Sequence, residues 1–225
     1  MNVVTPYVSI YNDSDKEMLF GLNDGIKLLK KIEYLGRISH RSEEAQSETS
    51  WERFLNAVVM TKGDWSIVEH ASLTVIFYVD RGITHEIVRH RLASYTQEST
   101  RFVNYEKKMP ASFIYPEQHI EEFMDEDWVK CIETCEETYK KLIGKGWTPQ
   151  IARSVLPNAL GSMIAMTCNL RNWRHFLLMR TTRETHPQAR EVTLPLLGML
   201  QKYIPLLFSD IEPMVTQADN LKKMR

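Results

Sequence analysis

The stretch from Arg89 to Arg101 reads RHRLASYTQESTR and concentrates side chains that bind anions. It combines three arginines, a histidine and several hydroxyl and amide groups with a single acid, Glu98. Arginine presents a planar fork of donors that matches a carboxylate or a phosphate, and hydroxyl groups add neutral donors. A solvated basic turn would contain similar residues, but their concentration favours a site for a phosphorylated small molecule.

The charge balance of the whole chain favours a small-molecule ligand over nucleic acid. The 225 residues include 28 basic and 29 acidic side chains, which give a formal net charge of −1. A nucleic-acid-binding protein usually carries a surplus of positive charge. We therefore predict that the protein has no nucleic-acid partner.

The sequence also predicts a cytoplasmic protein with no membrane partner. The N-terminal segment MNVVTPYVSIYNDSD lacks the basic start and apolar core of a signal peptide. No later segment offers the roughly eighteen uninterrupted apolar residues that a membrane helix needs. With 43% hydrophobic residues, the chain can bury a core as one domain over residues 1–225.

Common catalytic and nucleotide-binding motifs are absent. Ser94 and Ser99 lie near His90 in the sequence, but neither sits in a G-x-S-x-G elbow, which disfavours a serine nucleophile. His85 and His90 do not have the spacing of a helical zinc pair, and we expect no metal. The chain has neither G-x-G-x-x-G nor G-x-x-x-x-G-K-[ST], so any nucleotide must be held in another way.

A strand and a helix are expected just before the anion-rich stretch. From Ala71 to Val79 the odd positions are all apolar, which is typical of a half-buried strand. After Gly82 the sequence THEIVRHRL returns to helical spacing, so the anion-rich stretch should begin on a helix end. On a continuous helix Arg89 and Arg91 would point roughly 200° apart, and would serve different ligands unless the helix unwinds between them.

Apolar periodicity and capping residues predict the remaining elements. An apolar run at 160–169 fits a buried strand or a buried helix, and we favour a strand. Cys131 and Cys135 lie one turn apart and are both interpreted as structural. Cys135 belongs to the apolar seam of an amphipathic helix, together with Trp128, Ile132, Tyr139 and Leu142. Helices are expected at 15–34, at 50–60 with a Ser50 cap, at 116–143, at a short segment carrying Gln150 and Arg153, at 171–182, and at 187–207 with interruptions at Pro195 and Pro205.

The helix expected at 171–182 carries polar residues on two faces. Arg171 and His175 are four positions apart and share a face, whereas Arg171 and Arg180 lie on roughly opposite faces. One helix would then contribute to two pockets. A packed helix histidine is the alternative interpretation of His175.

The motif and its surroundings resemble a known enzyme family. Six of the seven fixed positions of the pattern R-H-R-x-x-S-x-N-x-x-S-x-R are present, and the exception is Thr96 in place of asparagine. Further matches follow in order along the chain: GRISHRSE, SIVEHASLTV, IARSVLP and NLRNWRHFLLMR. The sequence therefore resembles the flavin-dependent thymidylate synthases over most of its length.

The resemblance implies a reaction, a fold and an assembly. The implied reaction converts dUMP to dTMP, with 5,10-methylenetetrahydrofolate as carbon donor and tightly bound FAD, reduced by NADPH, as hydride donor. The flavin carries the difficult step, so no covalent protein nucleophile is expected. The implied fold is α+β, a helix-rich single domain around an antiparallel sheet. The implied assembly is a homotetramer with active sites at subunit interfaces.

Residue by residue, the resemblance implies two sets of contacts. The flavin set is Ser39, Ser66, Glu69, Arg89, His90, Arg91, Leu92, Gln97, Asn169, Arg171 and His175. The dUMP set is Glu86, Arg89, Gln97, Glu98, Ser99, Thr100, Arg101, Arg153 and Arg180. At Glu86 other members can carry glutamine. The anion-rich stretch is then a junction between two ligand sites, with Arg89 as a contact to both.

Arg180 is the predicted catalytic side chain. A guanidinium placed against the pyrimidine would favour loss of the N3 proton and stabilise the resulting anion. Two alternatives use the same arginines: a non-catalytic nucleotide-binding or nucleic-acid-binding module, and a flavoprotein of the same fold that acts on another pyrimidine nucleotide.

Overall fold

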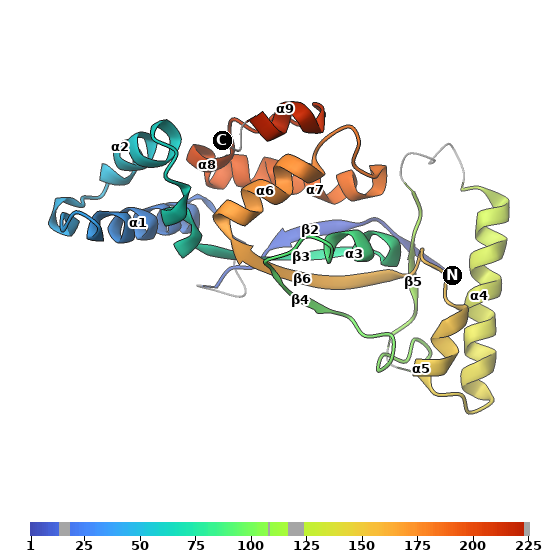
Figure 1. Ribbon diagram of the computed structural model, residues 1–225. Helices are drawn as coiled ribbons and strands as arrows, with labels where there is room; N and C mark the ends of the chain where they lie inside the picture. Colours follow the sequence, from blue (N-terminus) through green and yellow to red (C-terminus); the bar gives the residue numbers. More distant parts are fainter. Residues whose placement is uncertain (14–18, 108, 117–123, 223–225) are drawn as a thin grey trace. The chain divides into compact units, whose positions relative to one another are not determined.

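The computed structural model describes residues 1–13, 19–107, 109–116 and 124–222 (Figure 1). The strands are β1 (Asn2–Val4), β2 (Tyr7–Ile10), β3 (Ser72–Asp80), β4 (Ser94–Gln97), β5 (Ser112–Ile114) and β6 (Gly161–Asn169). The α-helices are α1 (Leu22–Ile38), α2 (Ser50–Leu55), α3 (Arg81–Ile87), α4 (Glu126–Gly144), α5 (Pro149–Ala152), α6 (Leu170–Arg180), α7 (Pro187–Tyr203), α8 (Pro205–Phe208) and α9 (Gln217–Leu221). The short helical segments are η1 (Glu43–Ala45), η2 (Asn56–Thr61), η3 (Trp65–His70) and η5 (Arg153–Val155).

The four-stranded sheet has the order β2-β3-β6-β4, and β3 and β6 are its long central strands. These two strands are antiparallel. The Leu170 amide donates to the Ala71 carbonyl, and further along β3 the Thr74 and Thr167 hydroxyls lie 2.8 Å apart. The odd positions of β3 are buried, as predicted, and the run at 160–169 is a strand rather than a helix. The predicted α+β class with an antiparallel sheet is confirmed.

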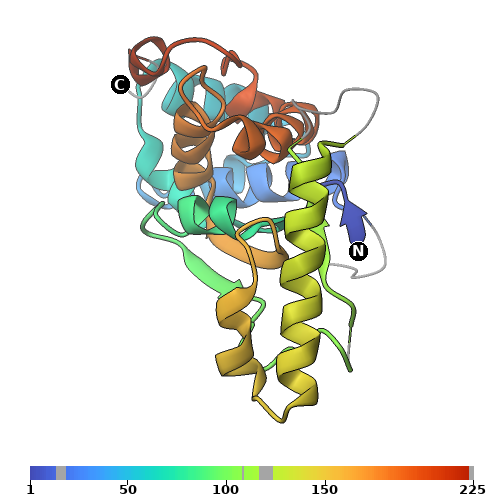
Figure 2. The same cartoon turned by 90° about the vertical axis from the view of Figure 1, so that its right-hand side faces the viewer.

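One compact unit comprises Met1–Tyr7, Phe77–His90 and Tyr95–Ala165. Within it, β1 and β5 pair in parallel, and Figure 2 shows α4 and α5 side by side. Its buried cluster consists of Tyr105, Ala111, Phe113, Ile132, Tyr139, Ala152 and Leu160. The seam predicted for α4 therefore faces a core.

The second compact unit comprises Val8–Ile76, Arg91–Ser94 and Met166–Arg225. In it α6 packs against η3, α7 and α9. In Figure 1 the three α-helices are drawn in orange to red, and η3 is teal. Trp173 of α6 is fully buried, and its indole Nε1 donates to the Leu73 carbonyl at 3.0 Å. This bond fixes the start of α6 against β3.

The helix expected over THEIVRHRL ends earlier than its periodicity indicates. Helix α3 ends at Ile87, and Ser94–Gln97 forms β4, which we did not predict. The Tyr95 hydroxyl bonds to the carbonyls of Ile87 and His90, which a continuing helix would have used. Arg89 and Arg91 therefore lie beyond the helix, and the angle expected between them does not apply.

Two other helix starts differ from the predictions. Helix α1 begins at Leu22, where the Asp24 carboxylate accepts from the Gly21 amide at 3.0 Å, and part of the expected start at 15–18 lies outside the described residues. Helix α4 begins at Glu126 rather than at 116, because Asp125 caps it by accepting from the Trp128 amide. Residues 117–123 lie outside the described part.

The remaining helices agree with the predictions in place but differ in detail, and α7 continues through Pro195, where an interruption was expected. Thr49, not Ser50, is the residue before α2, and the expected continuation to Met60 is the π-helical turn η2. Gly146, at φ +89°, follows the end of α4, and Thr148 precedes Pro149 at the start of α5. Across the described residues, no helix combines the length and apolar character needed to cross a membrane.

Candidate functional site

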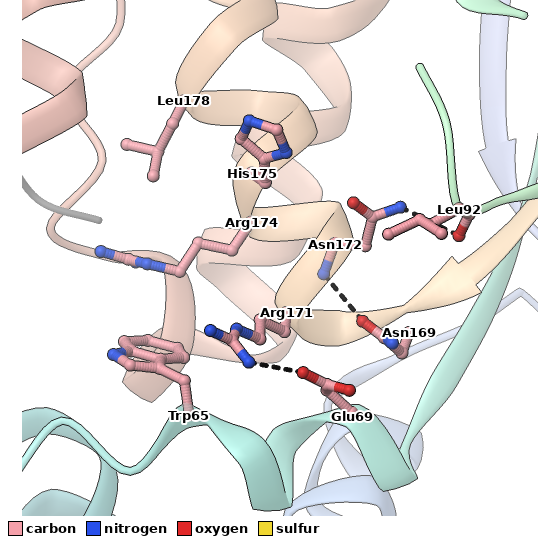
Figure 3. Close-up of a pocket in the computed structure, with 9 residues that line it drawn as sticks. All are labelled: Trp65, Glu69, Leu92, Asn169, Arg171, Asn172, Arg174, His175 and Leu178. Carbon is pink, nitrogen blue, oxygen red and sulfur yellow. Dashed lines mark hydrogen bonds and ion pairs between the residues drawn. The ribbon is translucent and has the colours of Figure 1, made fainter. Parts of the chain in front are cut away.

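A cavity of about 300 Å³ in the second unit contains five of the eleven residues predicted to contact flavin (Figure 3). Its lining comes from the end of β6, from α6, from η3 and from the chain before β4. The predicted residues in it are Glu69, Leu92, Asn169, Arg171 and His175, and the others are Trp65, Asn172, Arg174 and Leu178. Arg180 does not line it, as its position on the other face of α6 predicts.

The N-terminus of α6 orders one side of this cavity. The Asn169 side chain caps the helix by accepting from the Asn172 amide at 2.8 Å. The Asn172 side chain in turn donates to the carbonyls of Arg91 and Leu92 at 3.3 and 3.2 Å. Leu92 has φ +66° and is 92% exposed, so this bonding holds a strained and otherwise unpacked turn beside the cavity.

Glu69 and Arg171, which both line the cavity, form an ion pair. Arg171 Nη1 lies 2.5 Å from Glu69 Oε1, and both side chains are about half exposed (Figure 3). Exposed pairs of this kind contribute little to folding, on the order of 0–1 kcal/mol. The pair therefore contributes little to the stability of the fold.

A buried arginine of α6, Arg174, also lines the cavity. Its guanidinium donates to the Leu207 carbonyl at 2.7 Å and to both carboxylate oxygens of Asp210 at 2.7 and 2.5 Å. It also lies over the Trp65 ring, 4.8 Å from the ring centroid. Sequence reasoning did not select Arg174 or Trp65 for the site. The available signal was an arginine on the apolar face of α6, beside Trp173 and Leu177.

His175 shares the cavity with Arg171, as their spacing predicts. Burial lowers the pKa of the His175 imidazole, because the charged form loses solvation. The ring is therefore neutral over a wider pH range than an exposed histidine.

The lowered pKa predicts a pH dependence of stability. The unfolded chain takes up a proton near pH 6.5 while the folded chain stays neutral to lower pH, so acidification below about 6.5 should destabilise the fold. The His175→Gln variant should lose this part of the pH dependence. Urea unfolding of both proteins at pH 7.5 and 5.5 measures it; identical pH dependence in the two would contradict the assignment.

The other six residues of the flavin set do not line this cavity. The Ser39 hydroxyl donates to the Gly36 carbonyl at the end of α1, and the Ser66 hydroxyl of η3 donates to Asp64, the residue before η3. Arg91 contributes its carbonyl to Asn172. The remaining three, Arg89, His90 and Gln97, belong to the first unit.

Two residues of the dUMP set meet in a second cavity, which lies in the first unit and has a volume of about 280 Å³. Arg153 Nη1 donates to the Thr100 hydroxyl at 2.9 Å, although 53 positions separate them. Thr100 is only 3% exposed. The motif and the segment IARSVLP are thus brought together by a direct side-chain bond.

Gln97 and Glu98 point to different partners. Gln97 Nε2 donates to the Thr84 hydroxyl at 2.9 Å, while Glu98 lines a third cavity, of about 670 Å³, in the same unit. The Tyr105 hydroxyl donates to Glu98 Oε1 at 2.7 Å. Burial and this bond to the carboxylate raise the pKa of Tyr105, so its hydroxyl remains a donor.

The rest of the dUMP set falls into three places. Glu86 lies on α3, and Arg89 follows the end of that helix. Ser99 Oγ accepts from the Arg101 amide at 3.3 Å. Arg180 is the last residue of α6 and belongs to the second unit, unlike the other eight members.

The sequence is similar to known proteins over most of its length. Residues 27–206 match the family model described as "Thymidylate synthase complementing protein". The flavin-dependent thymidylate synthase of Pyrococcus furiosus is 34% identical over 190 residues, which cover 83% of this chain and 75% of that protein. The corresponding protein of Corynebacterium aurimucosum is 30% identical over 203 residues, covering 84% of this chain and 81% of that protein.

The fold is also similar to a solved structure. The UMP/dUMP methylase PolB from Streptomyces cacaoi, bound with 5-Br dUMP, has a TM-score of 0.71 at 22% identity. The match covers 93% of this chain and 96% of that chain. The family match spans most of the sequence, and the resemblance carried by the motif is confirmed. The chain therefore belongs to the flavin-dependent thymidylate synthase family, and the protein is an enzyme of the methyltransferase class.

Proposed function

We propose that the protein converts dUMP to dTMP, with FAD as a tightly bound cofactor. NADPH and 5,10-methylenetetrahydrofolate are the proposed co-substrates, and no covalent protein nucleophile takes part. The observation that carries the proposal is the grouping of Glu69, Arg171 and His175, each predicted from sequence as a flavin contact, around one cavity.

The donor set of this cavity fits a flavin dinucleotide. Arg171 and Asn169 offer polar contacts, Trp65 offers an aromatic surface, and His175 is held largely neutral beside them. Arginine side chains suit a pyrophosphate in a chain that lacks a glycine-rich loop. Bound FAD would supply the hydride; the protein residues would bind it, orient it and limit the access of water.

The dUMP set supplies donors for the nucleotide. We assign Arg153 and Thr100 to the phosphate end, because they already meet in one cavity. The nearby Gln97, Ser99 and Arg101 lie on the same stretch of chain and add polar groups for the sugar and base. Ser99 acts as a donor in this scheme, not as a nucleophile.

Arg180 is the proposed catalytic side chain. Its Nε is buried and has no hydrogen-bond partner among the described residues, and its backbone carbonyl accepts from the Thr193 hydroxyl at 2.7 Å. The backbone is thus fixed while a donor remains for a ligand. Placed against the pyrimidine, the guanidinium would stabilise the anion left when the N3 proton departs, which activates the ring for transfer at carbon.

Four further features belong to the same proposal. The chain acts as one domain over residues 1–225, since the family match crosses both compact units. Its active form is a homotetramer with active sites at subunit interfaces. Arg89 contacts both ligands. The enzyme works in the cytoplasm.

Replacing Arg171 by Met should separate flavin binding from folding. Loss of charge-assisted donors should weaken FAD binding roughly 10- to 100-fold. The free energy of unfolding should change by less than about 1 kcal/mol, because the Glu69 pair is half exposed. Flavin absorbance after gel filtration, together with urea unfolding of the FAD-free protein, measures both. A variant that keeps its flavin would remove Arg171 from the set.

Tritium release tests the proposed function directly. Wild-type protein incubated with dUMP labelled at position 5, FAD, NADPH and methylenetetrahydrofolate should release tritium to water, and omitting any one component should stop it. A protein that binds no flavin and releases no tritium would instead support a non-catalytic binding module. Release from another pyrimidine nucleotide but not from dUMP would support the flavoprotein alternative.

A further inference from the structure

Arg81 lies in the same cavity as Arg153 and Thr100 but belongs to neither predicted set. We propose that Arg81 is an additional donor to the phosphate monoester of the nucleotide, an assignment that rests on the proposed function. The cavity would then hold the phosphate between two guanidinium groups.

The composition of the cavity wall favours an anion. Its polar groups are two guanidinium groups, two hydroxyls and one amide, from Arg81, Arg153, Thr100, Ser154 and Asn158. Of the described residues that line it, none carries a carboxylate. Two like charges in one cavity repel each other, and a bound anion relieves that repulsion. A phosphate dianion can accept bonds from several such donors at once.

The side chain of Arg81 retains a donor for a ligand. Its Nη1 is buried and has no hydrogen-bond partner among the residues that the structure describes. Most buried polar atoms in proteins are bonded, because leaving a donor unsatisfied costs free energy. An incoming phosphate oxygen would satisfy this donor.

The backbone of Arg81 is held in place by the same cavity wall. Its amide donates to the carbonyls of Asn158 and Leu160 at 2.9 and 3.1 Å, and its carbonyl accepts from the Thr84 hydroxyl at 2.8 Å. Asn158 and Leu160 also line the cavity. Arg81 therefore starts from a fixed position at the first turn of α3, and little ordering of its backbone is needed on binding.

Affinity for nucleotide and nucleoside tests the assignment. Arg81→Met removes the guanidinium while keeping a long side chain, and Arg81→Lys keeps the charge without the planar fork. With FAD-loaded protein, the dissociation constant of dUMP should rise roughly 10- to 100-fold in Arg81→Met, with a smaller rise in Arg81→Lys. The affinity for deoxyuridine, which lacks the phosphate, should not change. Arg53→Met, an exposed arginine on α2 outside both sets, is the matched control.

Three outcomes would overturn the assignment. Unchanged dUMP affinity in Arg81→Met would show that Arg81 does not meet the phosphate. Equal weakening of dUMP and deoxyuridine would indicate a structural role. A rise confined to the KM for methylenetetrahydrofolate would assign the cavity to the carboxylates of the folate. Failure of the proposed function is distinguishable, because it appears in the wild-type protein as a lack of tritium release from dUMP.

Discussion

Arg180→Ala should lower the turnover of saturating dUMP by about 100- to 1,000-fold, the usual effect of removing a donor that stabilises charge in a transition state. Bound FAD should stay close to the wild-type level, since Arg180 does not line the cavity that contains Arg171 and His175. Turnover of the variant should rise with pH, because bulk base then removes the N3 proton that the guanidinium would have made more acidic. Tritium release at several pH values and flavin absorbance measure these effects.

Two comparisons make this test specific. Arg180→Lys retains the positive charge and should recover part of the lost activity. Arg53→Ala removes an exposed arginine outside both sets and should behave as wild type. Turnover of Arg180→Ala equal to that of wild type at saturating dUMP would exclude Arg180 from the chemistry.

Arg174→Met should have the largest effect on stability among the residues around the flavin cavity. The variant loses the bonds to Asp210 and the Leu207 carbonyl as well as the contact with Trp65. We expect the free energy of unfolding to fall by about 3 kcal/mol, since the bonds are charge-assisted and the guanidinium is buried. FAD retention should fall as well, because Trp65 loses the group that holds its ring.

Two other variants give losses in the free energy of unfolding with which that of Arg174→Met can be compared. Arg171→Met, on the same helix, removes only a half-exposed pair and should cost less than about 1 kcal/mol. Asp210→Asn keeps an acceptor oxygen for Arg174 and should lie between the two. Urea unfolding of all three FAD-free proteins measures the order, and a cost for Arg174→Met no larger than that for Arg171→Met would contradict the structural argument.

The two long strands, β3 and β6, and the long helices could be predicted because their signals are local and periodic. The odd positions of β3 are apolar because they face a core, and the seam of α4 recurs for the same reason. Element ends were harder to predict. Helix α3 ends at Ile87, where the Tyr95 hydroxyl donates to the carbonyls of Ile87 and His90, and apolar spacing does not predict this interaction.

Part of the candidate site could be predicted from the sequence, and part could not. Arg171 and His175 were placed on one face by helix geometry, and both line one cavity. Arg174 was missed because its partner Asp210 lies 36 positions further along the chain, so nothing near it in sequence signals a buried ion pair. The roles of Arg180 and Arg89 stay predictions, because they concern contacts with ligands.

The two bonds from Asn172 to the carbonyls of Arg91 and Leu92 have a consequence for genome surveys. The side chain that supports the turn of the motif lies 80 positions after Leu92, outside any pattern that covers only residues 89–101. A homologue could keep every arginine and serine of the signature and still lack this support.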